Sequence, residues 1–239
     1  MALTAMTMLN AKNEPVIVLE GDLSFWTANG KLATIDIDWN DAEVVEFGNK
    51  DKVKDDFGTI DQYNKKQGED YVNDWPAVKQ TVLTTASMFA NMTNKKKGLK
   101  IITPQEPATL EAIKNMTDEQ KAELKAAQAK AEKRHLLYRD YDLATYDIKV
   151  HVDTIDMGNA AASAFASLAG EGQYRGGAVL IGTMEVRNRQ TQELVCKLQF
   201  DHLKGRGSYA ETARLGNVYW RLWGEELPAM IKAAGKKKK

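Results

Sequence analysis

The chain has 239 residues, of which 43% are hydrophobic and 28% are charged, and it contains a single cysteine, Cys196. A chain of this length can bury a core without a disulfide or a structural metal, and one cysteine excludes an intrachain disulfide. The 33 basic residues balance the 33 acidic ones, but four lysines form the terminal run 236–239, so the remainder is mildly acidic. This balance argues against a nucleic-acid partner, which would require clustered positive charge.

The first eleven residues are small and apolar, and the first charged residue is Lys12. Their composition is typical of the second half of a secretory signal, although the usual basic segment is missing. A start codon assigned too far downstream would explain the difference, and a frayed or strand-like N-terminus is the alternative. We therefore predict a truncated signal over residues 1–11, a single domain over residues 12–235 and a solvated lysine tail over residues 236–239. The predicted location is periplasmic or secreted, with the cytoplasm as the alternative. The sequence contains no run of about 18 apolar residues, so we predict no transmembrane segment.

Alternating or β-branched runs predict strands along much of the chain. These strands cover residues 16–25, 32–39 with a continuation over 42–47, 99–103, 143–155, 178–187 and 194–203. Asn29-Gly30 is a strong hairpin signal between the first two of them. Residues 50–74 are polar and poorly periodic, which predicts a long excursion with room for one short helix.

Helical spacing of apolar residues and capping signals predict three main helices. They cover residues 75–94, 117–134 and 209–234. The second has a thin apolar stripe and is expected to face solvent. In the third, Ser208 and Glu211 form a capping box, and Pro228 is expected to kink the helix near Gly224.

The strand over residues 143–155 has the clearest alternation in the chain. Its even-numbered side chains from Ala144 to Val152 are apolar, and the odd-numbered ones between them are polar. Together with the two strands that follow, it predicts three neighbouring antiparallel strands with one polar face. The predicted fold class is therefore α+β, with a mixed, mainly antiparallel sheet covered on one face by helices and with a long C-terminal helix.

The polar face of this strand is the first candidate binding surface, and it is formed by Asp147, Lys149 and His151. His151 is the one histidine in a strand with carboxylates alongside, so a proton-transfer site is the alternative, which would need a concave surface. The three histidines lie in different elements without metal-ligand spacing, and no P-loop or nucleophile-elbow sequence occurs. We predict no catalytic residue, no metal and no cofactor.

The second candidate is the connector over residues 158–177, which is unusually long for a link between two strands. Its sequence places Phe165 and Leu168 among small residues before a glycine-rich end. This pattern indicates a short helix or flap that closes a cleft or meets a partner. A helix lying on its own domain is the structural alternative.

The run Gly177–Gly205 contains an apolar strand, the turn Arg-Asn-Arg-Gln-Thr-Gln-Glu and a second strand. This run resembles the strand, D-x-x-T-G-E turn and strand of small bacterial envelope proteins. They include uncharacterised secreted proteins and lipoproteins, the amino-terminal domain of the TolB type and the periplasmic part of the curli secretion lipoprotein. The likeness extends from Asp142 onward, with Asn188 and Gln192 where Asp and Gly are usual. It implies an exported, non-enzymatic α/β module used in assembly or binding.

Three functions follow from these observations. The first is a non-enzymatic, exported binding or assembly module of the cell envelope, with a protein partner or a second copy of the chain as its partner. The second is an enzyme of unknown class that uses the strand face around His151. The third is a structural component of an oligomeric envelope or phage assembly. A cavity containing His151 and convergent carboxylates would favour the enzyme, whereas a solvated sheet face would count against it.

Overall fold

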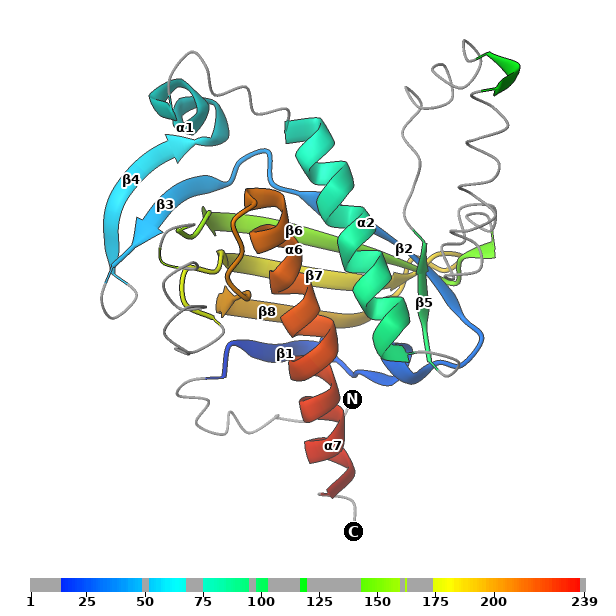
Figure 1. Ribbon diagram of the computed structural model, residues 1–239. Coiled ribbons are helices and arrows are strands. Elements are labelled where there is room, and N and C mark those ends of the chain that lie inside the picture. The colour runs from blue at the N-terminus through cyan, green and yellow to red at the C-terminus, as the bar shows by residue number, and fades with distance from the viewer. Residues whose placement is uncertain are drawn as a thin grey trace.

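The computed structural model describes residues 14–48, 52–67, 75–94, 98–102, 117–119, 143–159, 162 and 174–236. These residues form one eight-stranded sheet with helices across one of its faces (Figure 1). The strands are β1 (Val16–Gly21), β2 (Leu32–Asp38), β3 (Glu43–Phe47), β4 (Val53–Thr59), β5 (Lys100–Ile102), β6 (Tyr146–Asp156), β7 (Val179–Asn188) and β8 (Leu194–Lys204). Their order is β1-β8-β7-β6-β2-β5, and β3 pairs with both β4 and β6. The predicted α+β fold class is confirmed.

The sheet is built around the antiparallel meander β6-β7-β8. Alternate side chains of these strands, among them Val150, Met184 and Leu198, are fully buried, and those between them are partly or fully exposed. Period-two alternation places successive side chains on opposite faces, so one face enters the core and the other contacts water. The predicted antiparallel strands and their single polar face are therefore present.

Parallel strands extend the meander on the other side of β6. β2 pairs in parallel with the first part of β6, through residues up to Asp38↔His151, and β3 pairs in parallel with its last part. β3 thus continues β2 along one edge of β6 after the bend at residues 39–42, as predicted. β3 then forms a hairpin with β4, and helix α1 (Ile60–Gln67) follows. Residues 50–74 were predicted to be irregular, which was wrong for β4. The short helix predicted within them corresponds to α1.

Helix α2 (Trp75–Asn94) and the C-terminal helical segment cover the apolar face of the sheet (Figure 1). The C-terminal segment consists of α6 (Glu211–Arg221), the π-helical turn η4 (Leu222–Glu226) and α7 (Leu227–Lys236). It buries the predicted apolar stripe, including Leu215, Val218 and Leu222. Trp223 stacks on Trp26 from the short 3₁₀ helix η1 (Ser24–Thr27), with the ring centroids 5.1 Å apart. Of the helix predicted over residues 117–134, only residues 117–119 lie within the described part of the chain.

Pro228 explains the change of helix type before α7. Proline has no N–H, so it cannot donate to the carbonyl of Gly224 four residues earlier, and its ring crowds that carbonyl. In the structure the Leu227 N–H donates to the carbonyl of Leu222 five residues earlier, which widens the turn. The irregularity that was predicted near Gly224 is therefore a π-helical turn.

Candidate functional site

The predicted binding residues of β6 lie together on the face of the sheet opposite α2 and α6, which we call the outer face. Asp147 accepts a 2.6 Å hydrogen bond from Thr34 Oγ1, and its Oδ1 is 3.5 Å from Arg189 Nη1. Lys149 Nζ lies 3.6 Å from Asp38 Oδ2. The structure therefore brings the predicted residues into a network of charged neighbours.

His151 lies between two carboxylates in the same network. Its Nδ1 is 3.8 Å from Asp38 Oδ2 and its Nε2 is 3.3 Å from Asp153 Oδ1. The His151 side chain is 45% exposed and Asp153 is 54% exposed. Contacts between polar side chains this exposed stabilise a protein by roughly 0–1 kcal/mol at most, because water competes with them. His151 therefore occupies a solvated surface.

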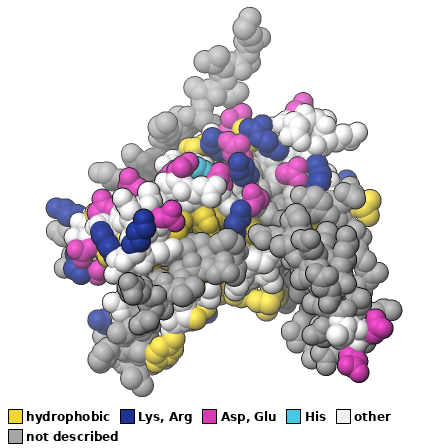
Figure 2. All heavy atoms as spheres, turned by 90° about the horizontal axis from the view of Figure 1, so that it is seen from above, with side chains coloured by type: hydrophobic (Ala, Val, Ile, Leu, Met, Phe, Trp, Pro, Cys, Tyr) yellow, Lys and Arg dark blue, Asp and Glu magenta, His cyan; other side chains and the backbone are white. Residues whose placement is uncertain are grey.

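The outer face continues across β7 and β8 as paired charges. Glu185 accepts hydrogen bonds from Lys197 at 2.9 Å and from Arg187 at 2.8 Å. The hydrogen bond from Lys197, followed by that from Arg187, lowers the pKa of Glu185 below its usual value. Figure 2 shows acidic and basic side chains interspersed over the described part of the surface it displays. On β7 and β8, the charges of Glu185, Arg187 and Lys197 therefore compensate one another locally.

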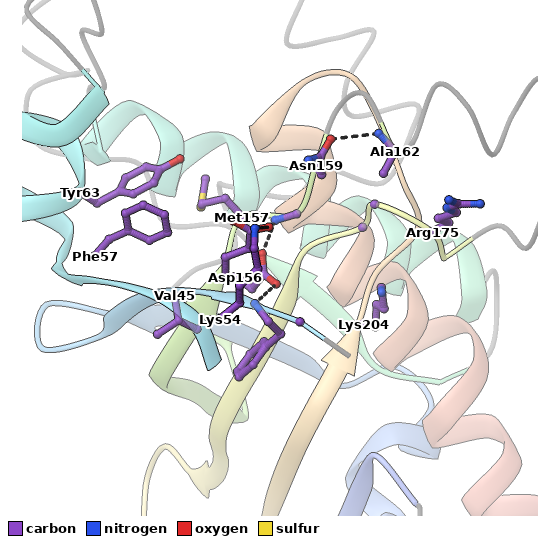
Figure 3. A pocket seen from close by; sticks show the side chains of 16 residues that line it. Val45, Lys54, Phe57, Tyr63, Asp156, Met157, Asn159, Ala162, Arg175 and Lys204 are labelled. Atoms are coloured by element: carbon purple, nitrogen blue, oxygen red, sulfur yellow. Dashed lines mark hydrogen bonds and ion pairs between the residues drawn. The ribbon is translucent and has the colours of Figure 1, made fainter. Parts of the chain in front are cut away.

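A hollow of about 650 Å³ lies at one end of the sheet, and we call it the sheet-end pocket. β3, β6 and β8 all end there, because β3 runs parallel to β6 while β8 is separated from β6 by the antiparallel strand β7. The pocket is lined by Val45, Glu46, Phe47 and Gly48 of β3 and its turn, Lys54 and Phe57 of β4, Tyr63 of α1, residues 156–159 and 162, Arg175, Gly176, Gly177 and Lys204. Figure 3 shows Phe57 and Tyr63 at one end, Arg175 and Lys204 at the other, and Asp156 and Met157 between them.

Asp156 forms the floor of the pocket and joins its two walls. Its Oδ2 accepts a 3.0 Å hydrogen bond from the backbone N–H of Phe47, and its Oδ1 accepts one of 2.7 Å from the N–H of Gly158. The carboxylate thereby holds the end of β3 beside the end of β6. Burial raises the pKa of Asp156 above its usual value of 3.8, although the two backbone donors and Lys204 oppose this effect. Asp156 therefore has a defined structural role in the pocket floor.

The pKa of Asp156 leads to a prediction for stability. The folded protein binds this proton more tightly than the unfolded chain, so the contribution of Asp156 to stability is complete below pH 3.8 and is lost as the pH rises through the raised pKa. In Asp156→Asn the side chain does not titrate. Urea unfolding at several pH values is expected to show the free energy of unfolding of wild type falling relative to that of the variant between pH 3.8 and neutrality. If the free energy of unfolding of wild type instead rose relative to that of Asp156→Asn over the same pH range, the pKa of Asp156 would not be raised.

The base of the predicted connector forms one wall of the pocket. The Asn159 N–H donates to the carbonyl of Gly176 at 3.0 Å and so closes the base of this segment. The Tyr174 hydroxyl donates to Glu225 Oε2 on η4, and the guanidinium of Arg221 lies over the Tyr174 ring, 4.8 Å from its centroid. These contacts fix the connector base against the C-terminal helical segment. Phe165 and Leu168, which were predicted to contribute to binding, lie outside the described residues.

Other reactive groups lie away from the pocket. Cys196 is buried in the core, and burial raises the pKa of its thiol to about 12, which leaves little reactive thiolate at neutral pH. Within the described ranges, His, Cys, Asp and Glu side chains do not gather into a group that could hold a metal ion. The helices of the described residues include none with the length and hydropathy that a membrane span requires.

The sheet-end pocket was not predicted from the sequence, although the connector that forms part of its wall was. The lining residues come from six separate parts of the chain, and only the sheet order brings them together. The glycine-rich end of the connector was the one local signal. Gly158 and Gly176 both adopt positive φ, 69° and 71°, which favours glycine at the points where the chain turns into and out of the connector.

No protein-family model matches the chain, and no curated protein matches it. Among solved structures, a PelC dodecamer from Paraburkholderia phytofirmans is similar, with a TM-score of 0.38 and 9% identity, over 89% of this chain and 95% of that chain. A crystal structure of a protein from Xanthomonas campestris has a TM-score of 0.30 and 8% identity, over 92% of this chain and 94% of that chain. At these TM-scores and identities the likenesses carry no argument about function.

Proposed function

We propose that this chain is a non-enzymatic binding module that captures a ligand in the sheet-end pocket. The observation that carries the proposal is the pocket itself. Its volume of about 650 Å³ lies within the range of small-molecule sites, roughly 300–1,000 Å³. Aromatic side chains and cationic side chains line opposite ends of it, so the pocket offers apolar contact and a few polar groups that orient a ligand.

The position of His151 supports binding over catalysis. A general acid or base must lie within hydrogen-bond reach of the substrate it serves. His151 lies on the exposed outer face and is not among the residues that line the sheet-end pocket. The pocket's buried carboxylate, Asp156, already accepts two backbone hydrogen bonds that hold β3 beside β6.

The cellular setting is part of the same proposal. The composition of residues 1–11 and the resemblance from Asp142 onward support an exported protein of the bacterial cell envelope. A protein partner, homo-oligomerisation and assembly into a larger structure stay predictions. Cell fractionation of the native host would test the location, because a protein found in the cytoplasm would contradict export.

Filling the pocket is expected to abolish ligand capture. Ala162 lines the pocket and is half-buried, so Ala162→Trp would place an indole ring inside it. Native mass spectrometry of protein purified from its source is expected to show a bound ligand in wild type and its loss in this variant. Ala229→Trp is the matched control, because Ala229 is exposed on α7 and does not line the pocket.

His151→Ala separates binding at the pocket from chemistry on the outer face. The same measurement is expected to find the ligand retained in this variant, because His151 does not line the pocket. A wild-type protein without ligand, or equal retention in Ala162→Trp, would contradict capture in the sheet-end pocket. Loss of ligand in His151→Ala would show that the ligand binds on the outer face instead.

A further inference from the structure

The cationic end of the sheet-end pocket contains a lysine that forms no direct ion pair with a carboxylate of the described residues. Lys204 is the last residue of β8, it is partly buried, and it lines the pocket. Its backbone carbonyl accepts a 3.0 Å hydrogen bond from Arg221 Nη1, which holds the end of the strand against α6. Among the described residues, its ammonium has no carboxylate within ion-pair distance. Arg175 adds a second cationic side chain at this end of the pocket (Figure 3).

The acidic side chains of the pocket are occupied elsewhere. Glu46 accepts a 2.9 Å hydrogen bond from Lys54, and these two charges form an exposed ion pair. Both carboxylate oxygens of Asp156 accept hydrogen bonds from backbone N–H groups. Lys204 acts on this carboxylate electrostatically, without a direct ion pair. Neither of these two carboxylates therefore forms a direct ion pair with Lys204, whose ammonium is available at this end of the pocket.

The opposite end of the pocket is aromatic. The rings of Phe57 and Tyr63 meet edge to face, with their centroids 5.5 Å apart. Tyr63 is buried, and Met157 beside them is 4% exposed, so both positions are fixed by packing. Edge-to-face pairs of this kind give a rigid apolar surface for a ring or an alkyl chain.

We propose that the ligand of the sheet-end pocket carries an oxyanion, either a carboxylate or a phosphate, at one end and an apolar or aromatic group at the other. The oxyanion binds at Lys204, and the apolar group packs on Phe57, Tyr63 and Met157. This inference rests on the proposed function and specifies the class of ligand. A lysine ammonium is a suitable donor to either oxyanion, because it acts as a point charge with three rotatable N–H groups.

Titration of the intact ¹⁵N-labelled protein with three small probes tests this assignment. The probes are 4-phenylbutyrate, its neutral isostere 4-phenylbutanamide, and phenyl phosphate. The amide signals of Gly158, Gly176 and Gly177 report binding, because all three glycines line the pocket. At least one of the two anions is expected to bind about tenfold more tightly than the amide, because a hydrogen bond to a charged group contributes that much to affinity. The stronger of the two anions identifies carboxylate or phosphate as the preferred group.

Variants of Lys204 assign the effect to this residue. Lys204→Gln is expected to remove the roughly tenfold preference for the anion, while Lys204→Arg, which keeps the charge, retains most of it. Lys197→Gln is the control, because Lys197 lies on the outer face in an ion pair with Glu185. Equal affinity for anions and amide would overturn the ligand class and leave the pocket as a binding site. Failure of all three probes to shift the glycine signals would overturn both the ligand class and the proposed function.

Discussion

Replacing Gly177 with alanine is expected to lower the free energy of unfolding by about 3 kcal/mol, the upper end of the usual range for overpacking. A Cβ atom at this position would lie 1.8 Å from the carbonyl oxygen of Gly205 and 3.0 Å from the carbonyl carbon of Arg206. Both neighbours are backbone atoms, so no side chain can rotate to make room. Gly205 is itself confined, because a Cβ there would lie 2.6 Å from the backbone nitrogen of Val218 in α6. The connector base, the link after β8 and α6 are thus stacked through two glycines.

Urea unfolding followed by tryptophan fluorescence would measure this loss, which corresponds to roughly 6–12 °C in Tm for a protein of this size. Gly224→Ala is the matched control. An added Cβ there has its nearest neighbours 3.8 Å away, which is ordinary van der Waals contact. Alanine is favoured over glycine in helical structure by about 0.5–1 kcal/mol, so this variant is expected to be neutral or slightly more stable. Equal stability of Gly177→Ala and wild type would show that the two backbones do not cross this closely.

The meander β6-β7-β8 could be predicted because each of its strands has one wet face and one buried face. This arrangement produces alternation in the sequence, and Val150 and Met184 are buried where it places them. β4 has no such pattern, because it is an edge strand whose residues from Val53 to Asp56 are exposed on both faces. A strand without a buried face gives no period-two signal. Its pairing with β3 depends on the hairpin and could not be seen in the polarity of its residues.

The parallel pairing of β2 and β3 with β6 also could not be predicted from local sequence patterns. These contacts join residues more than a hundred positions apart, such as Asp38 and His151. The predicted residues Asp147, Lys149 and His151 do lie on one polar face, because all three belong to one strand with regular alternation. The sheet-end pocket depends on the register and direction of four strands, so its Lys204 and Phe57 had no common signal in the sequence.

The start of the C-terminal helix shows how tertiary contacts override a local signal. The capping box predicted for Ser208 and Glu211 is wrong, since α6 begins at Glu211 with Ala210 as N-cap and without a side-chain cap hydrogen bond. The backbone carbonyls of Ser208 and Tyr209 instead accept hydrogen bonds from Arg214, which is 3% exposed. An arginine in the first turn of an amphipathic helix would be expected to face solvent, so this burial has no sequence signal.

Arg214→Met is expected to destabilise the protein by about 3–5 kcal/mol, as for removal of one member of a buried charged network. Arg214 Nε donates to the carbonyl of Met157 at 2.6 Å, and Nη1 donates to the carbonyls of Ser208 and Tyr209 at 2.9 and 2.8 Å. A positive charge near a helix N-terminus is unfavourable for the helix dipole. The Glu211 carboxylate, 3.7 Å from Arg214 Nη2, offsets part of this cost, so the main benefit of this residue comes from its donated hydrogen bonds. Methionine fills a similar volume but leaves three carbonyl groups without this donor.

Urea unfolding of Arg214→Met, Arg214→Lys and Arg187→Met would separate the contribution of these hydrogen bonds from that of charge. Lysine keeps the charge but lacks the planar fork, so Arg214→Lys is expected to lose most of the same stability. Arg187 is 42% exposed on the outer face, and its loss is expected to cost about 1 kcal/mol or less. Since Met157 lines the sheet-end pocket, the loss of its partner Arg214 is also expected to weaken ligand capture in the fraction that remains folded. Equal unfolding free energies for Arg214→Met and Arg187→Met would mean that water satisfies the three carbonyls, and Arg214 would then not be what holds α6 to the end of β6.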